Sequence, residues 1–148
     1  MTRTQVSRIV NAPIGVVFNT VADINQFSKA IPHIVKVEIL SDVRSGVGTK
    51  FRETRLMKGR EAATDLEVTE FAQNEHVRLV ADSHGTIWDS VFAVKSIAGG
   101  TELTLTMDAK SDKLIPKIMN RLIYGMVKKA LERDMDSVKE YCEKEKTK

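Results

Sequence analysis

The spacing of hydrophobic residues changes twice along the chain, from helical to strand-like and back to helical. After a short expected strand at 4–10, apolar residues recur three and four positions apart over residues 14–31, which predicts two short amphipathic helices. Asn11-Ala12-Pro13 supplies a candidate N-cap and a proline for the first helix, and Asp23 is the candidate cap of the second. Pro32 is expected to end the second helix.

From residue 33 onward apolar and polar residues alternate, which is the period of a strand with one face in solvent. Short alternating runs follow one another, separated by turns that contain glycine, at 45–48, 59, 84–85 and 99–100. Parallel strands require crossovers of about a dozen residues, so strands joined by such tight turns must be antiparallel. The pattern predicts an antiparallel sheet of about seven strands.

The last part of the chain predicts one long helix, roughly Asp112 to Glu143, with a cap at Ser111 or Asp112 and Pro116 in its first turn. Its apolar residues come in pairs four positions apart, so the apolar stripe drifts by roughly 40° per repeat. Such a stripe suits a helix that lies across a twisted sheet. Gly125 lies inside this helix at a cost of about 1 kcal/mol relative to alanine, and close packing, a bend or space for a ligand would explain it.

Together these elements predict an α+β fold in which a curved sheet wraps around a long C-terminal helix. Because helix and sheet differ in curvature, we expect a gap between them, and a concave apolar gap with a few polar groups is a usual small-molecule site. The alternative is that the same side chains fill a close-packed core. The side chains expected to face the gap are Val37, Ile39, Phe51, Leu66, Val68, Leu79, Trp88, Ser90, Phe92, Leu103 and Met107 from the sheet and Met119, Leu122, Ile123 and Met126 from the helix.

One expected strand places Glu53 and Arg55 on the same face as Phe51. Charged side chains are rarely buried unless they are paired or hydrated, so an internal Glu53 and Arg55 would give the gap a polar part that water or a ligand occupies. The alternative register turns Thr54 and Leu56 inwards instead. Glu53 and Arg55 also belong to the ligand-binding set and are the candidates for acid–base catalysis, although the sequence leaves the catalytic residues unknown.

Composition and motifs exclude several classes of protein. The 148 residues suit one domain, 1–148, and 42% hydrophobic with 29% charged residues is typical of a globular chain. No apolar run approaches the roughly 18 residues of a membrane span, and the first residues lack a secretory signal, so we expect a cytoplasmic protein. Cys142 is the only cysteine and the three histidines lack metal-ligand spacing, so we expect no disulfide, no metal and no cofactor.

Positive charge is concentrated at the end of the chain. Residues 110–148 hold eleven basic and seven acidic residues, against twelve and thirteen in residues 1–109. A basic helix could contact phosphates or a membrane surface, but lysine and glutamate are interleaved over residues 140–146, which favours a solvated face. We therefore expect no stable membrane insertion, while transient contact with a membrane surface stays open. Only 5% of residues are aromatic, so no nucleic-acid partner is expected, and the oligomeric state is open.

Short motifs span essentially the whole chain: Asn11-Ala12-Pro13 with Val17, Phe18, Val21, Ala22 and Asp23, then Phe27 to Pro32, Gly46-Val47-Gly48-Thr49, Gly85-Thr86-Ile87-Trp88, Gly100-Thr101-Glu102-Leu103 and the terminal helix. With these motifs the chain resembles the START-like, or SRPBCC, superfamily of helix-grip proteins, which includes polyketide cyclase/dehydrase and lipid-transport proteins. The resemblance implies a seven-stranded antiparallel sheet gripping the C-terminal helix, two small helices between the first two strands, and a tunnel for an apolar molecule.

The resemblance leaves the function open, because members share the cavity and differ in what they bind. The main hypothesis is a carrier or chaperone whose partner is a small apolar ligand: a lipid, an isoprenoid quinone or a polyketide-like molecule. The segment 27–40 also looks like the coenzyme Q-binding branch of the superfamily. The alternatives are a cyclase/dehydratase-type enzyme that uses the same pocket, and a protein-interaction or stress-response domain.

Overall fold

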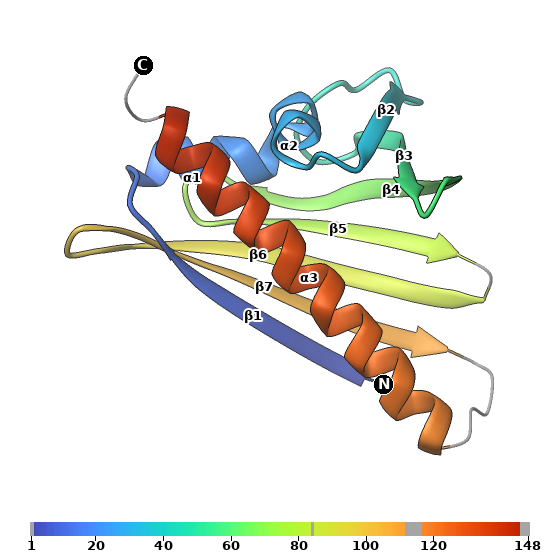
Figure 1. The fold of residues 1–148 in the computed structure, drawn as a ribbon. Helices are drawn as coiled ribbons and strands as arrows, with labels where there is room; N and C mark the ends of the chain where they lie inside the picture. Colours follow the sequence, from blue (N-terminus) through green and yellow to red (C-terminus); the bar gives the residue numbers. More distant parts are fainter. Residues whose placement is uncertain (1, 84, 112–116, 146–148) are drawn as a thin grey trace.

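A curved antiparallel sheet and a long helix lying across it form the framework of the molecule (Figure 1). The computed structural model describes residues 2–83, 85–111 and 117–145. In chain order the elements are β1 (Thr2–Val10), α1 (Ile14–Ala22), α2 (Ile24–Ala30), β2 (Ile34–Ile39), β3 (Lys50–Met57), β4 (Arg60–Ala72), β5 (His76–Ser83), β6 (Thr86–Ile97), β7 (Gly100–Ser111) and α3 (Lys117–Glu145). The predicted helix-grip fold class, with two short helices between the first two strands, is confirmed.

Strands β2 to β7 form a meander, and β1 is added at the edge of the sheet beside β7. The strand order is β1-β7-β6-β5-β4-β3-β2, so every neighbour is consecutive in the chain except β1, which pairs with β7. Register shifts interrupt the pairing of β2 with β3 and of β4 with β5. Such bulges bend a strand and increase its twist, which helps the sheet to curve around α3.

The two short helices begin for different reasons. Asp23 caps α2 as predicted, because its side-chain oxygen accepts hydrogen bonds from the backbone N–H groups of Asn25 and Gln26, at 2.9 and 3.1 Å. The prediction of an Asn11 cap for α1 is wrong, since the N-cap is Pro13 and no side chain satisfies it. Asn11 contacts α3, since its backbone N–H donates to Glu143 Oε2 at 2.9 Å.

Only the second half of α3 is packed into the core. Leu131, Met135, Val138 and Cys142 are at most 5% exposed, and their spacing of three and four places them on one side of the helix. By contrast, every residue from Ile118 to Tyr124 is exposed. The apolar stripe, which was expected to suit a helix lying across the twisted sheet, therefore packs into the core only in the second half of α3.

The described bounds of α3 differ from the predicted range of Asp112 to Glu143. The predicted cap at Asp112 and the proline at 116 lie outside the described residues, and the described helix runs from Lys117 to Glu145.

Close packing does not explain Gly125, because a Cβ built there would have no atom of another part of the protein within 4 Å. Among the described residues, no helix is both long and apolar enough to cross a membrane.

Candidate ligand-binding site

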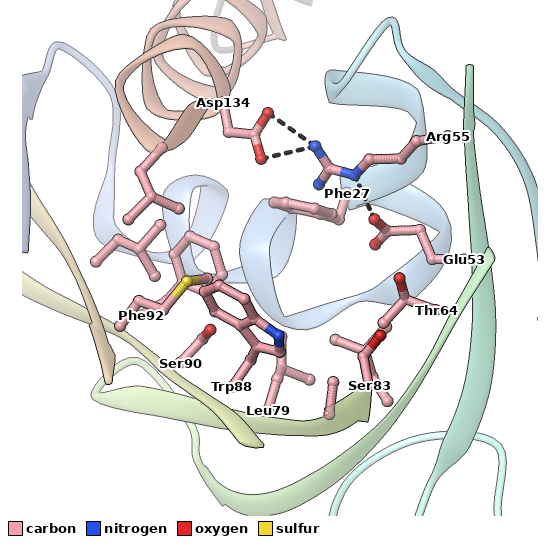
Figure 2. A pocket seen from close by; sticks show the side chains of 15 residues that line it. Phe27, Glu53, Arg55, Thr64, Leu79, Ser83, Trp88, Ser90, Phe92 and Asp134 are labelled. Atoms are coloured by element: carbon pink, nitrogen blue, oxygen red, sulfur yellow. Dashed lines mark hydrogen bonds and ion pairs between the residues drawn. The ribbon is translucent and has the colours of Figure 1, made fainter. Parts of the chain in front are cut away.

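A pocket of about 240 Å³ lies between the concave face of the sheet and the helices α2 and α3 (Figure 2). Its walls are mainly apolar, with a charged cluster at one end. The lining residues are Phe27 from α2, Glu53 and Arg55 from β3, Thr64 and Leu66 from β4, Leu79, Ala81 and Ser83 from β5, Trp88, Ser90 and Phe92 from β6, Leu105 and Met107 from β7, and Leu131 and Asp134 from α3.

Strand register brings the central wall together. Ser90 on β6 lies opposite Leu79 on one side and Met107 on the other. Facing residues of paired strands point to the same side of a sheet, so these three side chains form one row across three strands. The same register pairs Ala81 with Trp88. The alternation seen in the sequence is thus converted into a continuous inner surface.

The polar end of the pocket is an ion-pair cluster built from two distant parts of the chain. Arg55 Nε donates to Glu53 Oε1 at 2.5 Å, and Arg55 Nη1 lies 3.0 Å from Asp134 Oδ2. Figure 2 shows the Asp134 side chain reaching from α3 to the guanidinium of Arg55. The side chains of Arg55, Glu53 and Asp134 are 25%, 11% and 14% exposed. The structure therefore places Glu53 and Arg55 on the inner face, as the first of the two registers requires.

Burial and pairing set the charges of this cluster. Burial by itself would lower the pKa of Arg55, but the negative charges of Glu53 and Asp134 outweigh it and raise that pKa, so the guanidinium stays protonated. Burial raises the pKa of Asp134 above the ordinary aspartate value despite its contact with Arg55. The pocket thus combines a permanent cation with a carboxyl group that accepts a proton more readily than an exposed aspartate.

A second pocket of about 210 Å³ adjoins the first beneath the exposed half of α3. Trp88 and Met107 belong to the walls of both pockets, so the two spaces lie on either side of these side chains. From α3 the second pocket is lined by Asn120, Ile123, Tyr124 and Val127. A ligand longer than the first pocket has this space in which to continue.

The structure brings together many of the sequence-predicted site residues. The first pocket is lined by Glu53, Arg55, Leu66, Leu79, Trp88, Ser90, Phe92 and Met107, and the second by Ile123. Val37 and Phe51 lie at a small hollow of about 20 Å³ that shares Phe27, Glu53 and Leu79 with the first pocket. Ile39 and Val68 line a different surface pocket beside α1 and α2, and Leu103 is fully buried in the core.

Three of the expected helix residues lie elsewhere. Met119, Leu122 and Met126 are 50%, 60% and 71% exposed and line neither the first nor the second pocket. A helix can turn only one side toward a sheet, and Ile123 and Val127 occupy that side here. The paired apolar positions therefore lie on two sides of α3, one facing the pocket and one facing away.

Several lining residues were not foreseen from the sequence. They are Phe27, Thr64, Ala81, Ser83, Leu105, Leu131 and Asp134. Asp134 could have been found, because it lies three residues after Leu131 and four before Val138, within the apolar stripe of the helix. In the described ranges, no three histidine, cysteine, aspartate or glutamate side chains are grouped as a metal site requires.

The comparisons with known proteins agree with this architecture. Residues 1–143 match the family described as "Polyketide cyclase / dehydrase and lipid transport". None of the curated proteins compared with the chain by sequence matches it.

Similar solved structures share the fold at low sequence identity. The Zhui aromatase/cyclase from Streptomyces sp. R1128 is 16% identical, with a TM-score of 0.79 over 96% of this chain and 93% of that one. A START superfamily protein from Mycobacterium smegmatis is 16% identical, with a TM-score of 0.77 over 96% and 97% of the two chains. TTHA0849 from Thermus thermophilus is 16% identical, with a TM-score of 0.77 over 95% and 97%.

Proposed function

Because the chain belongs to the polyketide cyclase / dehydrase and lipid transport family, we propose that it binds one small, largely apolar molecule between the sheet and α3, as a carrier or chaperone. The observation that carries this proposal is a pocket with mainly apolar walls and a partly buried charged cluster at one end. Removing apolar surface from water stabilises a complex by about 25 cal/mol per Å², before the costs of association. The apolar walls therefore supply affinity, and the cluster orients the ligand.

The charge of the cluster supports a ligand with a neutral polar group. Arg55 contributes one positive charge, and Glu53 and Asp134 each contribute a carboxyl group that already contacts it. Among the residues that line the first pocket, Arg55 alone is basic, and both carboxyl groups already contact it, so this lining leaves no unpaired positive charge for an anionic head group. A buried anion without a partner is costly. A hydroxyl group can instead donate to Asp134, and a hydroxyl or carbonyl oxygen can accept from Arg55. Phenols, quinones and ketones therefore fit this site better than fatty acids do.

The volume of the first pocket supports a compact ring system. A dry cavity of about 150 Å³ holds benzene. The first pocket, at about 240 Å³, accommodates a body of one or two rings, and the second, at about 210 Å³, a substituent or chain. A quinone or polyketide-like molecule with one polar end meets both conditions.

Fluorescence of Trp88 tests the proposal, because this residue is the only tryptophan and lines both pockets. We expect menadione, a neutral two-ring quinone, to quench it saturably, and decanoate to bind at least about tenfold more weakly because of the unpaired carboxylate. Native mass spectrometry of the purified protein would identify a molecule that copurifies with it.

A matched pair of variants checks the location of the ligand. Ser90→Phe fills the pocket wall and should abolish quenching, whereas Val91→Phe, at the next position on β6 and outside the pocket lining, should leave it intact. Loss of quenching in both folded variants, or in neither, would contradict this placement. Equal affinity for menadione and decanoate would contradict the assigned role of the cluster.

A cyclase/dehydratase-type enzyme is the second candidate, and the position of Asp134 favours it. A carboxyl group with a raised pKa beside a cation can exchange a proton with a bound ketone or alcohol. Under this alternative Asp134→Asn removes turnover of a poly-β-keto substrate while the affinity for menadione stays within about twofold. Glu53→Gln should behave in the same way if Glu53 is the base instead. The absence of turnover in the unmodified protein would favour the carrier.

A further inference from the structure

The outer side of the first half of α3 is apolar and exposed. Ile118, Leu122 and Met126 are 75%, 60% and 71% exposed, and Met119 beside them is 50% exposed. Positions three and four apart lie on one face of a helix, so these side chains form a continuous patch. The patch faces away from the side of α3 that lines the second pocket. We call it the outer α3 face.

Basic residues accompany this face without any acidic ones. Arg121, Lys128 and Lys129 are exposed, and none has an ion-pair partner among the described residues. The sequence contains no aspartate or glutamate from 117 to 131. The first acidic residue after this stretch is Glu132, whose Oε2 lies 3.8 Å from Nη2 of Arg8 on β1. The interleaved acidic and basic residues noted in the sequence are thus confined to the second half of the helix.

We propose that the outer α3 face docks on the surface of an anionic phospholipid bilayer. A helix with exposed apolar residues on one side and lysine and arginine beside them binds such a surface by inserting its apolar side chains while its cations meet lipid phosphates. The proposal goes beyond ligand binding and holds whatever molecule the pocket takes.

The charge of the face argues against a second copy of this chain as the occupant. A two-fold dimer brings the same patch of each subunit together. Here that contact would place Arg121, Lys128 and Lys129 of one copy close to the same residues of the other, with no acid in the patch to pair with them. Like charges in such a contact are unfavourable, whereas an anionic lipid surface is complementary.

Docking in this orientation would leave α3 itself between the lipid and the second pocket. Ile123 and Tyr124, which line that pocket, belong to the same exposed turns as the outer α3 face and are 37% and 38% exposed. Tyrosine is favoured at the level of lipid head groups. An apolar molecule dissolved in the bilayer would then reach the pocket around the edge of α3, past Ile123 and Tyr124.

Vesicle flotation with the purified chain, without added ligand, tests the proposal. We expect the protein to float with equimolar phosphatidylcholine and phosphatidylglycerol vesicles, not with pure phosphatidylcholine, and to be released by high salt. Each basic residue near an anionic surface changes binding by about fivefold, so replacing Arg121, Lys128 and Lys129 together with glutamine should weaken binding about a hundredfold. Leu122→Ser combined with Met126→Ser should abolish it.

The control is Val47→Ser, which also removes an exposed apolar side chain, 58% exposed, in the loop between β2 and β3. It should float like the unmodified protein. Thermal unfolding and menadione quenching of Trp88, measured on every variant, separate a failure of docking from a failure of folding or of the proposed ligand site.

Three outcomes would overturn the proposal. The folded protein does not float with anionic vesicles, the glutamine variant binds as tightly as the unmodified protein, or sedimentation shows a dimer that Leu122→Ser dissociates.

Discussion

We expect Arg55→Met to destabilise the protein much more than Arg52→Met, although both arginines lie on β3 and bind carboxylates. Arg55 lies between Glu53 and Asp134, which are 11% and 14% exposed, whereas Arg52 and Asp65 are 45% and 55% exposed. Breaking a buried pair costs about 3–5 kcal/mol because a charge is left without a partner, and the residual exposure of this cluster puts the loss near about 3 kcal/mol. An exposed pair contributes less than about 1 kcal/mol.

The loss of stability caused by Arg55→Met should also depend on pH. Burial already raises the pKa of Asp134 above its ordinary value of 3.8, and removing the neighbouring cation raises it further. A carboxyl group whose pKa is raised in the folded state contributes stability that is fully present below the unfolded pKa and lost as the pH rises through the folded pKa. Arg55→Met should therefore regain part of its lost stability as the pH falls from neutral towards the ordinary aspartate pKa, and Arg52→Met should not.

Urea unfolding followed by Trp88 fluorescence measures both effects, and thermal unfolding provides a second measure. A loss of about 3 kcal/mol corresponds to a decrease in Tm of about 6–12 °C for a chain of this size. Equal losses in the two variants would refute the argument that burial of the partners distinguishes the clusters. A difference between the variants that does not change with pH would refute the role assigned to Asp134.

The remaining predictions concern the backbone, a cap and the cysteine. Gly100→Ala should lower the free energy of unfolding in urea by more than about 2 kcal/mol, since the added Cβ would collide with the Val10 carbonyl oxygen. Gly125→Ala should raise it by up to about 1 kcal/mol, because no other part of the protein lies within 4 Å of the added Cβ. Asp23→Ala should lose about 1 kcal/mol with its two capping hydrogen bonds, which a Tm measurement detects. Cys142 is fully buried and burial raises its pKa, so an aromatic disulfide reagent should modify it only at the rate of unfolding, and fast reaction of the native protein would contradict its placement.

The fold could be predicted because hydrophobic period and turn residues act locally. Alternation over residues 33–111 and the glycine turns specify antiparallel strands, and the spacing of three and four before Pro32 specifies the two short helices. The resemblance to the START-like superfamily, which rests on motifs along the whole chain, is confirmed by the family match. The Asn11 cap was wrong because α1 begins at Ile14 with Pro13 at the N-cap position, so Asn11 lies two residues too early in the chain to cap the helix.

The site could be predicted only in part. Alternation shows which strand residues share one face of the sheet, but helical spacing does not show which side of a helix faces that sheet. Leu79, Ser90 and Met107 follow from alternation and lie in one row. Asp134 reaches Arg55 across 79 positions of the chain, and no local pattern shows that these two groups meet. For the paired apolar residues of α3, the spacing leaves open which member of each pair faces the sheet.

The pairing of β1 with β7 has a consequence for how the molecule forms. Val10 lies opposite Thr101 and Thr2 opposite Ala109, so the first strand pairs with the strand that is made last. Pairing these two strands closes the whole chain between β1 and β7 into one loop, which is entropically costly. Topologies dominated by contacts between distant parts of the chain fold slowly. During synthesis β1 has no neighbour until β7 emerges, and an unpaired strand edge can pair with other chains. This interval is when the nascent chain is most exposed to aggregation, and an early partner that covers β1 would protect it.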